Sequence, residues 1–293
     1  MIVKKIFKRL FSFAYFIFIR PFKKMPKVLS CEETIDYILK NKASLSRFGD
    51  GELNLMQGFD INFQKAEKRL SEKLIEVKTN NKLLVAIPSI FEKEQFNKNR
   101  IVLNEYKFWR KNKLFNYNYW HKYFKDNLVL GDAFISRFYM RYNNKENVGE
   151  YCKKLKTLWK GQNVIVVEGK NSQIGVGNDI LNNVKSIKRI LCPSKNAFSK
   201  YEEILSEVQN VAKKDDLILL AVGPTATVLA SDLSKLGYWA LDLGHFDIEY
   251  EWFLAKTDKK IPIKSKHVNE CGSNGSFMQE DKTYQKEIVK IIE

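Results

Sequence analysis

Six short runs of aliphatic and branched residues recur along the chain, and each is apolar on both sides of its two-residue period. They are residues 45–48, 83–87, 164–167, 187–191, 217–222 and 239–243. A strand with one face in water alternates polar and apolar residues, so these runs are typical of strands buried on both faces of a parallel sheet. Helix-like patterns follow, over residues 63–78, 178–184, 196–211 and 227–236. The alternation predicts an α/β, Rossmann-like domain: a mostly parallel sheet with helices on both faces.

Residues 91–125 interrupt this alternation with a segment rich in aromatic and basic residues. The segment predicts a helical insertion, either a wall over the binding site or a cap with an ordinary aromatic core. In open sheets of this kind the ligand binds beyond the carboxyl ends of the strands. The residues that follow each strand are therefore the candidates for binding and catalysis.

The amino-terminal end carries a marked excess of positive charge. The chain has 50 Lys and Arg against 34 Asp and Glu, a net charge of +16. The first thirty residues hold eight basic residues and no acidic one, which is half of that excess. The body is therefore only moderately basic, and the tail is the part that favours an anionic surface.

Residues 10–19 of this tail form an apolar, aromatic-rich run between two arginines. As a helix the run would cover about 15 Å, half of a hydrocarbon core, and Pro21 disfavours its continuation. We interpret residues 1–29 as a tail whose first 25 residues contact an anionic membrane surface. The side chains expected at the headgroup boundary are Phe11, Phe13, Tyr15, Phe16 and Phe18. The alternative is an ordinary first helix packed on the core. Nucleic-acid binding is not expected, because the run is too continuously apolar for a solvated binding strip.

The four cysteines lie far apart and form no Cys-x-x-Cys pair. A disulfide framework or a zinc site is therefore not expected, and a reducing compartment is the simpler interpretation. No uninterrupted apolar run reaches the roughly 20 residues that a membrane-spanning helix needs. We expect a cytoplasmic protein, with the tail peripheral on the inner face of the membrane.

The first candidate site is Arg47-Phe48-Gly49-Asp50-Gly51-Glu52, where a strand runs into a glycine-rich turn. Asp50 and Glu52 are two residues apart, so both carboxylates can reach one hard divalent cation. Such an ion can bridge a diphosphate and neutralise the charge of a leaving group, and Arg47 can pair with a phosphate through two hydrogen bonds. The structural alternative is a surface turn, with Asp50 as a cap and Glu52 in solvent.

Two further strands lead into loops that can bind anions. Gly175-Val176-Gly177-Asn178-Asp179 follows one, and Gly223-Pro224-Thr225-Ala226-Thr227 follows the other. A helix that begins in such a loop offers backbone N–H groups and capping side chains to a phosphate, although tight strand-to-helix turns give the same pattern. The first spacing is not Gly-x-Gly-x-x-Gly, so a dinucleotide site is not indicated. The residues expected to line the phosphates or the nucleotide are Gly175, Gly177, Asn178, Gly223, Thr225 and Thr227.

The densest cluster of acids and bases lies in Asp242-Leu243-Gly244-His245-Phe246-Asp247-Ile248-Glu249-Tyr250-Glu251-Trp252. Asp242 ends a predicted strand, so we expect it at the nucleotide site. The candidates for a general base are His245, Asp247 and Glu249. Alternating acids that face solvent or cap a helix would give the same pattern. His121 and His267 have no partner near them in the sequence and are not expected to be catalytic.

Together these motifs resemble the GT-D-fold bacterial glycosyltransferase family. The resemblance rests on the four stretches above, on Cys192-Pro193-Ser194-Lys195-Asn196-Ala197-Phe198 and on Phe134-Ile135-Ser136-Arg137-Phe138-Tyr139. It runs from about residue 30 to the end, so the tail lies outside it. An Arg is usual in the family near Gln173, and this departure leaves the donor contacts at that point open.

The resemblance implies a hexosyltransferase that takes a sugar from a UDP-sugar, UDP-glucose in known members. The acceptor would be a glycan, a glycoprotein or a lipid-linked glycan in polysaccharide or glycoprotein biosynthesis. The resemblance also implies a divalent metal, Mn²⁺ or else Mg²⁺, at an Asp-x-Glu motif. That motif is Asp50-Gly51-Glu52 here, so Asp50 and Glu52 are the expected metal ligands, in a transferase domain of residues 30–293.

Two alternatives remain open from the sequence. A Rossmann-class methyltransferase would use acidic residues such as Glu168 and Asp242 on ribose hydroxyls and would need no metal. A non-enzymatic module would bind anionic lipid or nucleic acid through the net charge of +16, with steep salt dependence.

Overall fold

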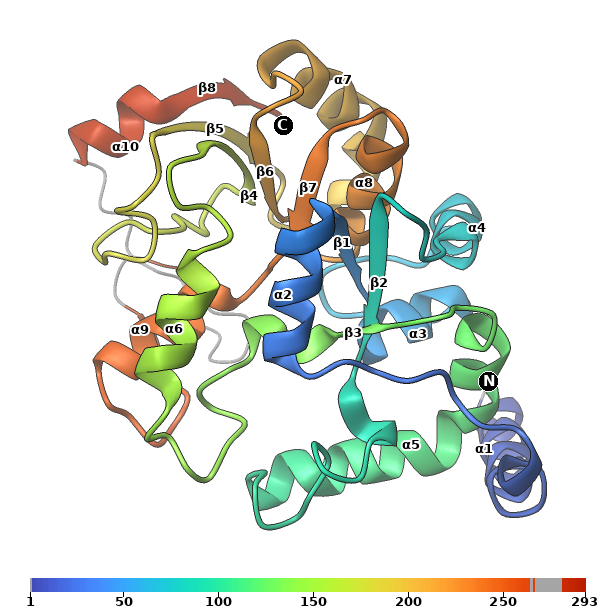
Figure 1. The fold of residues 1–293 in the computed structure, drawn as a ribbon. Coiled ribbons are helices and arrows are strands. Elements are labelled where there is room, and N and C mark those ends of the chain that lie inside the picture. The colour runs from blue at the N-terminus through green and yellow to red at the C-terminus, as the bar shows by residue number, and fades with distance from the viewer. Residues whose placement is uncertain (1, 264–265, 267–280) are drawn as a thin grey trace.

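The computed structural model describes residues 2–263, 266 and 281–293. Its centre is one eight-stranded sheet in the order β3-β2-β1-β7-β6-β4-β5-β8, and every pair of neighbouring strands is parallel (Figure 1). The strands are β1 (Ser44–Arg47), β2 (Leu83–Ile87), β3 (Gly131–Asp132), β4 (Asn163–Gly169), β5 (Ser186–Cys192), β6 (Leu217–Ala221), β7 (Trp239–Asp242) and β8 (Ile288–Ile291). The predicted α/β fold is confirmed.

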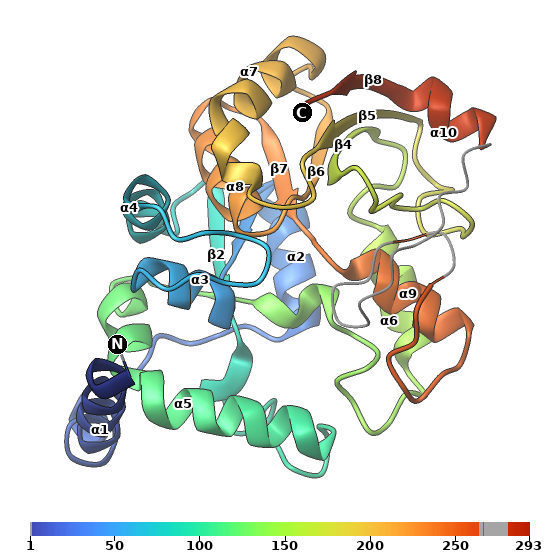
Figure 2. The same ribbon diagram turned by 180° about the vertical axis from the view of Figure 1, so that it is seen from behind.

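Helices cover both faces of this sheet (Figures 1 and 2). The α-helices are α1 (Ile2–Phe18), α2 (Cys31–Asn41), α3 (Asp50–Met56), α4 (Lys68–Glu76), α5 (Leu103–Phe124), α6 (Val148–Lys156), α7 (Tyr201–Val211), α8 (Pro224–Lys235), α9 (Phe246–Leu254) and α10 (Lys282–Glu287). Four 3₁₀ turns join them: η1 (Arg20–Phe22), η2 (Ser89–Phe91), η3 (Ala133–Ser136) and η4 (Ala197–Lys200). Helix α5 lies beyond the carboxyl ends of the central strands (Figure 1).

Strand β2 is apolar throughout because its successive side chains enter two different cores. In β2, Val85 and Ile87 belong to the core that contains residues of α7 and α8, whereas Leu84 and Ala86 belong to the core that contains residues of α2 and α6. All five residues of β2 are buried. This is the pattern of a parallel strand covered on both faces.

Four elements differ from the sequence expectations. Residues 178–184 form turns rather than a helix, because Gly177 has a φ of +79° and the Asn178 side chain is bound elsewhere. Strands β3 and β8 were not predicted, since β3 has only two residues and β8 is exposed at alternate positions. Helix α3 begins directly at Asp50, where the sequence indicated only a turn.

The aromatic insertion is the long helix α5, and α1 packs along it. Phe16 of α1 contacts Tyr117 of α5 edge to face, with ring centroids 5.5 Å apart. In the described part of the chain, no helix combines the length and the apolar character that crossing a membrane requires. Cys31, Cys152 and Cys192 are buried free thiols, as expected, and Cys271 and His267 lie outside the described residues.

Two glycines of the loop after β4 allow a test of this backbone. Gly175 and Gly177 have φ values of +76° and +79°, but a Cβ at Gly175 would lie 2.9 Å from Cδ1 of Leu181, whereas a Cβ at Gly177 would meet nothing within 4 Å. Gly177→Ala should cost about 1 kcal/mol of unfolding free energy from backbone strain alone. Gly175→Ala should cost about 2–4 kcal/mol, because a steric clash adds to that strain. Equal losses in urea unfolding would contradict the close approach of Leu181 to Gly175.

Candidate functional site

Asp50 and Glu52 lie together in the first turn of α3, at the carboxyl end of β1. The Glu52 side chain turns back so that its Oε2 accepts a hydrogen bond of 2.7 Å from the backbone N–H of Gly49, the residue before the helix. Negative charge at a helix amino terminus is stabilised by the helix dipole. This local geometry brings the two carboxylates, predicted as metal ligands, to one end of one short helix.

The two carboxylates repel each other in a poorly solvated place. Burial raises the pKa of Glu52 to about 7, and the nearby charges of Asp242 and Asp50 add to the rise. Burial also raises the pKa of Asp50, against the opposing effect of Arg137. The surroundings therefore disfavour two negative charges here unless a cation is added.

Arg47 and Asp242 form an ion pair between the carboxyl ends of β1 and β7, which are neighbours in the sheet. Arg47 Nη2 lies 2.8 Å from Asp242 Oδ1, and Nε donates to the Asp242 carbonyl at 2.6 Å. The remaining guanidinium N–H groups donate to Ala133, Ser136 and Gly244. All five donors are thus used inside the protein, which differs from the expected contact of Arg47 with a phosphate.

At the start of α8 the two predicted threonines are buried, whereas Gly223 before them is exposed. Gly223 has a φ of +59°, and a Cβ on it would lie 3.1 Å from Phe63. Thr227 Oγ1 bonds the Arg47 carbonyl at 2.9 Å and lies 3.2 Å from Asp242 Oδ2. Thr225 is fully buried, and its Oγ1 has no hydrogen-bond partner among the described residues. Of these predicted nucleotide contacts, Thr227 supports the Arg47–Asp242 pair instead.

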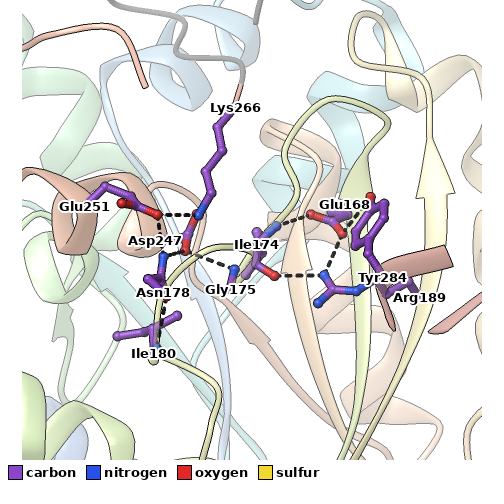
Figure 3. A network of polar contacts seen from close by, with 10 residues as sticks. All are labelled: Glu168, Ile174, Gly175, Asn178, Ile180, Arg189, Asp247, Glu251, Lys266 and Tyr284. Atoms are coloured by element: carbon purple, nitrogen blue, oxygen red, sulfur yellow. Dashed lines mark hydrogen bonds and ion pairs between the residues drawn. The ribbon is translucent and has the colours of Figure 1, made fainter. Parts of the chain in front are cut away.

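The loop after β4 is tied to α9 by Asp247 (Figure 3). Asp247 Oδ1 accepts from the Gly175 N–H at 3.0 Å and from Asn178 Nδ2 at 2.8 Å. Its Oδ2 lies 2.6 Å from Nζ of Lys266, which is fully buried and also 2.8 Å from Glu251 Oε1. The structure therefore brings together three residues predicted for the site, Asp247, Gly175 and Asn178, but as a bonded network.

A second buried network, beside the first one, holds the same loop through Ile174 (Figure 3). Glu168 accepts from the N–H of Ile174 at 2.8 Å and pairs with Arg189 Nη1 at 2.8 Å. Arg189 also donates to the Ile174 carbonyl. Both charged side chains are almost fully buried. Gln173, beside Ile174, is buried with a φ of +46°, and in the part of the chain that the structure describes its Oε1 has no hydrogen-bond partner.

Glu249, on α9, is also held by the protein. Its Oε2 accepts from the N–H groups of Tyr139 and Met140 at 2.8 and 2.9 Å, and its Oε1 lies 4.0 Å from Arg137 Nη1. Burial raises the pKa of Glu249, and Arg137 opposes that rise. His245 precedes α9 with a φ of +75° and is partly exposed.

Sequence reasoning did not single out Arg137 or Lys266 as site residues. Arg137 is the cation between Asp50 and Glu249, and no spacing rule ties it to either residue, which are 87 and 112 positions away. Across residues 2–263, 266 and 281–293, no three His, Cys, Asp or Glu side chains are grouped as a ready metal site. A cavity of about 630 Å³ lies at Asp132 and Phe138, on either side of η3, and neither Asp50 nor Glu52 lines it.

Comparison with known proteins identifies the family. Residues 45–271 match the model of the glycosyltransferase GT-D fold. The chain is 37% identical over 279 residues to a probable glycosyl transferase, Gly, of Streptococcus gordonii, covering 92% of this chain and 39% of that protein. It is 35% identical over 270 residues to the glycosyltransferase GlyD of Streptococcus pneumoniae, covering 91% and 32%. The chain thus spans about two fifths or less of the length of these relatives.

Solved structures agree with this match. A structure described as a new glycosyltransferase from Streptococcus sanguinis superimposes with a TM-score of 0.85 at 37% identity, over 92% of this chain and 100% of that one. Another, described as having a distinct glycosyltransferase fold, gives a TM-score of 0.85 at 40% identity, over 92% and 96%. The chain therefore belongs to the family of glycosyltransferases with the GT-D fold.

Proposed function

We propose that this protein transfers a sugar, glucose in the first instance, from a UDP-sugar to a glycan acceptor with the help of a divalent metal. The observation that carries the proposal is the pair of partly buried carboxylates, Asp50 and Glu52, at the carboxyl end of β1 in a glycosyltransferase fold. The acceptor would be a glycan, a glycoprotein or a lipid-linked glycan of polysaccharide or glycoprotein biosynthesis. The proposed setting is the inner face of a bacterial membrane.

The residues present fit Mn²⁺ or Mg²⁺. Carboxylate oxygens are ligands of hard divalent cations, and Mg²⁺ in particular is commonly held by one or two carboxylates together with substrate phosphates. Asp50 and Glu52 supply such a pair, and the pKa of each is raised chiefly by desolvation, which a bound cation would offset. When bound, the metal would offset the negative charge that develops on the UDP leaving group.

Other side chains would act by holding the site in shape. Arg47 and Asp242 fix β1 and β7 at the place where α3 begins. Asp247 and Glu249 have their oxygens engaged by backbone N–H groups, Asn178, Lys266 or Arg137. Of the three candidate bases, Asp247 and Glu249 are buried and His245 is partly exposed, so we rank His245 first on its exposure.

Removing either metal ligand should abolish most of the activity. Asp50→Asn and Glu52→Gln should each lower sugar transfer or hydrolysis of UDP-glucose, measured with Mn²⁺, by on the order of 100-fold or more. Glu33→Gln is the matched control, because Glu33 Oε2 makes the same 2.7 Å capping bond, to Ser30 N–H at the start of α2. Full activity of both site variants in folded protein would overturn the metal assignment.

The raised pKa of Glu52 predicts an unusual pH dependence of stability in metal-free protein. A carboxyl whose pKa rises on folding favours the folded state at low pH, and that contribution is lost as pH rises through about 4.5 to 7. Glu52→Gln should therefore be more stable than the parent at pH 8, by about 1–2 kcal/mol, in the presence of a chelator.

The control variant Glu33→Gln should change the stability at pH 8 in the opposite direction. The pKa of Glu33 is lowered, chiefly by its bond from the Ser30 N–H, so its ionised form stabilises the folded protein above its unfolded pKa. Glu33→Gln should lose stability at pH 8. Thermal unfolding of the two variants at pH 4 and pH 8 measures both effects, and a loss for Glu52→Gln at pH 8 would contradict the first.

The ranking of the bases has its own test. His245→Gln should lower transfer about 100-fold or more while leaving the unfolding midpoint near that of the parent. Asp247→Asn should instead lower the midpoint, because the buried Lys266 loses one of its two carboxylate partners and keeps Glu251. Unchanged turnover in His245→Gln would remove His245 from the mechanism.

A further inference from the structure

Helix α1 has one face that packs on the protein. Ser12 is fully buried and its hydroxyl donates to Asn118 Oδ1 on α5. Tyr15 and Phe16 lie on the same side, each within ring-contact distance of Tyr117. The packed helix was the alternative to a membrane tail, and these contacts differ from the expected place of Tyr15 and Phe16 at a headgroup boundary.

The opposite face of α1 is exposed and entirely apolar from residue 10 to residue 18. At 100° per residue its members fall within one continuous sector of the helix. They are Leu10, Phe11, Phe13, Ala14, Ile17 and Phe18. Phe11 is 64% exposed and Phe18 is 70% exposed, and Phe22 in η1 is 86% exposed. Single exposed apolar residues are common, but a contiguous aromatic patch of this kind marks an interaction site.

Cations stand at the carboxyl end of this apolar face. A cavity of about 560 Å³ between η1, η2 and α5 is lined by Arg20 and Lys24 together with apolar side chains such as Phe16, Ile17 and Phe91. Its one acidic member, Glu92, has Oε1 engaged by the Val28 N–H at 2.9 Å. The cavity is thus lined by two basic side chains and by apolar side chains.

We propose that the outward face of α1 (Leu10, Phe11, Phe13, Ala14, Ile17 and Phe18) inserts into the interfacial region of an anionic phospholipid bilayer, with Arg20 and Lys24 on a lipid phosphate. Amphipathic segments with an aromatic apolar face and flanking basic residues bind in this way. A second copy of the chain is the weaker fit, because pairing two α1 helices would bring together two segments with eight basic residues and no acidic one each.

The docking also fixes which side of the enzyme faces the lipid. Helix α1 packs on α5, and α5 lies beyond the carboxyl ends of the strands (Figure 1). Helix α3, which begins at Asp50, also contacts α5. The site and the apolar face therefore share the α5 side of the molecule. If the proposed transferase function holds, this arrangement suits an acceptor carried on a lipid.

Vesicle flotation of the full chain tests the docking. Wild-type protein should float with vesicles of phosphatidylcholine and phosphatidylglycerol at 70:30 and much less with phosphatidylcholine alone. The double variant Phe11→Glu/Phe18→Glu should lose at least tenfold in bound fraction. Arg20→Gln/Lys24→Gln should lose the preference for anionic vesicles. Leu236→Glu, an exposed apolar position between α8 and β7, is the matched control and should float as the wild type does.

The assay contains no sugar nucleotide, so its outcome is independent of the transferase proposal. Thermal unfolding midpoints confirm that the variants are folded. Equal flotation of wild type and Phe11→Glu/Phe18→Glu would overturn the docking. So would a dimer in solution that this double variant dissociates, combined with no wild-type binding to vesicles.

Discussion

The ion pair between Arg47 and Asp242 is the interaction on which the candidate site depends. It joins two strands that are neighbours in the sheet but 195 positions apart in the sequence. The same guanidinium reaches η3 through Ala133 and Ser136 and the turn before α9 through Gly244. The end of β1, η3 and the turn before α9 are therefore held together by the guanidinium of Arg47. Its five N–H donors have a fixed planar geometry, which allows one side chain to bond several segments.

The sheet could be predicted from the sequence because strands that are buried on both faces consist mostly of apolar residues. All six runs form strands, and the apolar side chains in them enter one of two cores. Shorter elements have too few residues to show such an apolar run. Strand β3 is only Gly131 and Asp132, and the turns after Gly177 keep a helix-like composition although no helix forms.

The site could be predicted in part for the same physical reason. Residues after a parallel strand gather at one edge, so the closeness of Asp50, Glu52 and Asp242 could be predicted from their positions along the chain. Their individual roles depend on contacts across the fold, which spacing does not encode. Arg47 and Asp247 carry the right chemistry for a ligand, yet the structure engages both within the protein. The family assignment favours a glycosyl transfer over the methyltransferase and non-enzymatic alternatives.

The capping bond of Glu52 to the Gly49 N–H has a consequence for ligand capture. The bond is made inside the protein, so the backbone turn that carries Asp50 is already set before any ion arrives. Binding of the proposed metal ion would then cost little further chain entropy, which is the usual benefit of preorganisation. An aspartate at position 52 would be one methylene shorter. We therefore expect it to reach the Gly49 N–H and the proposed metal less well than Glu52 does.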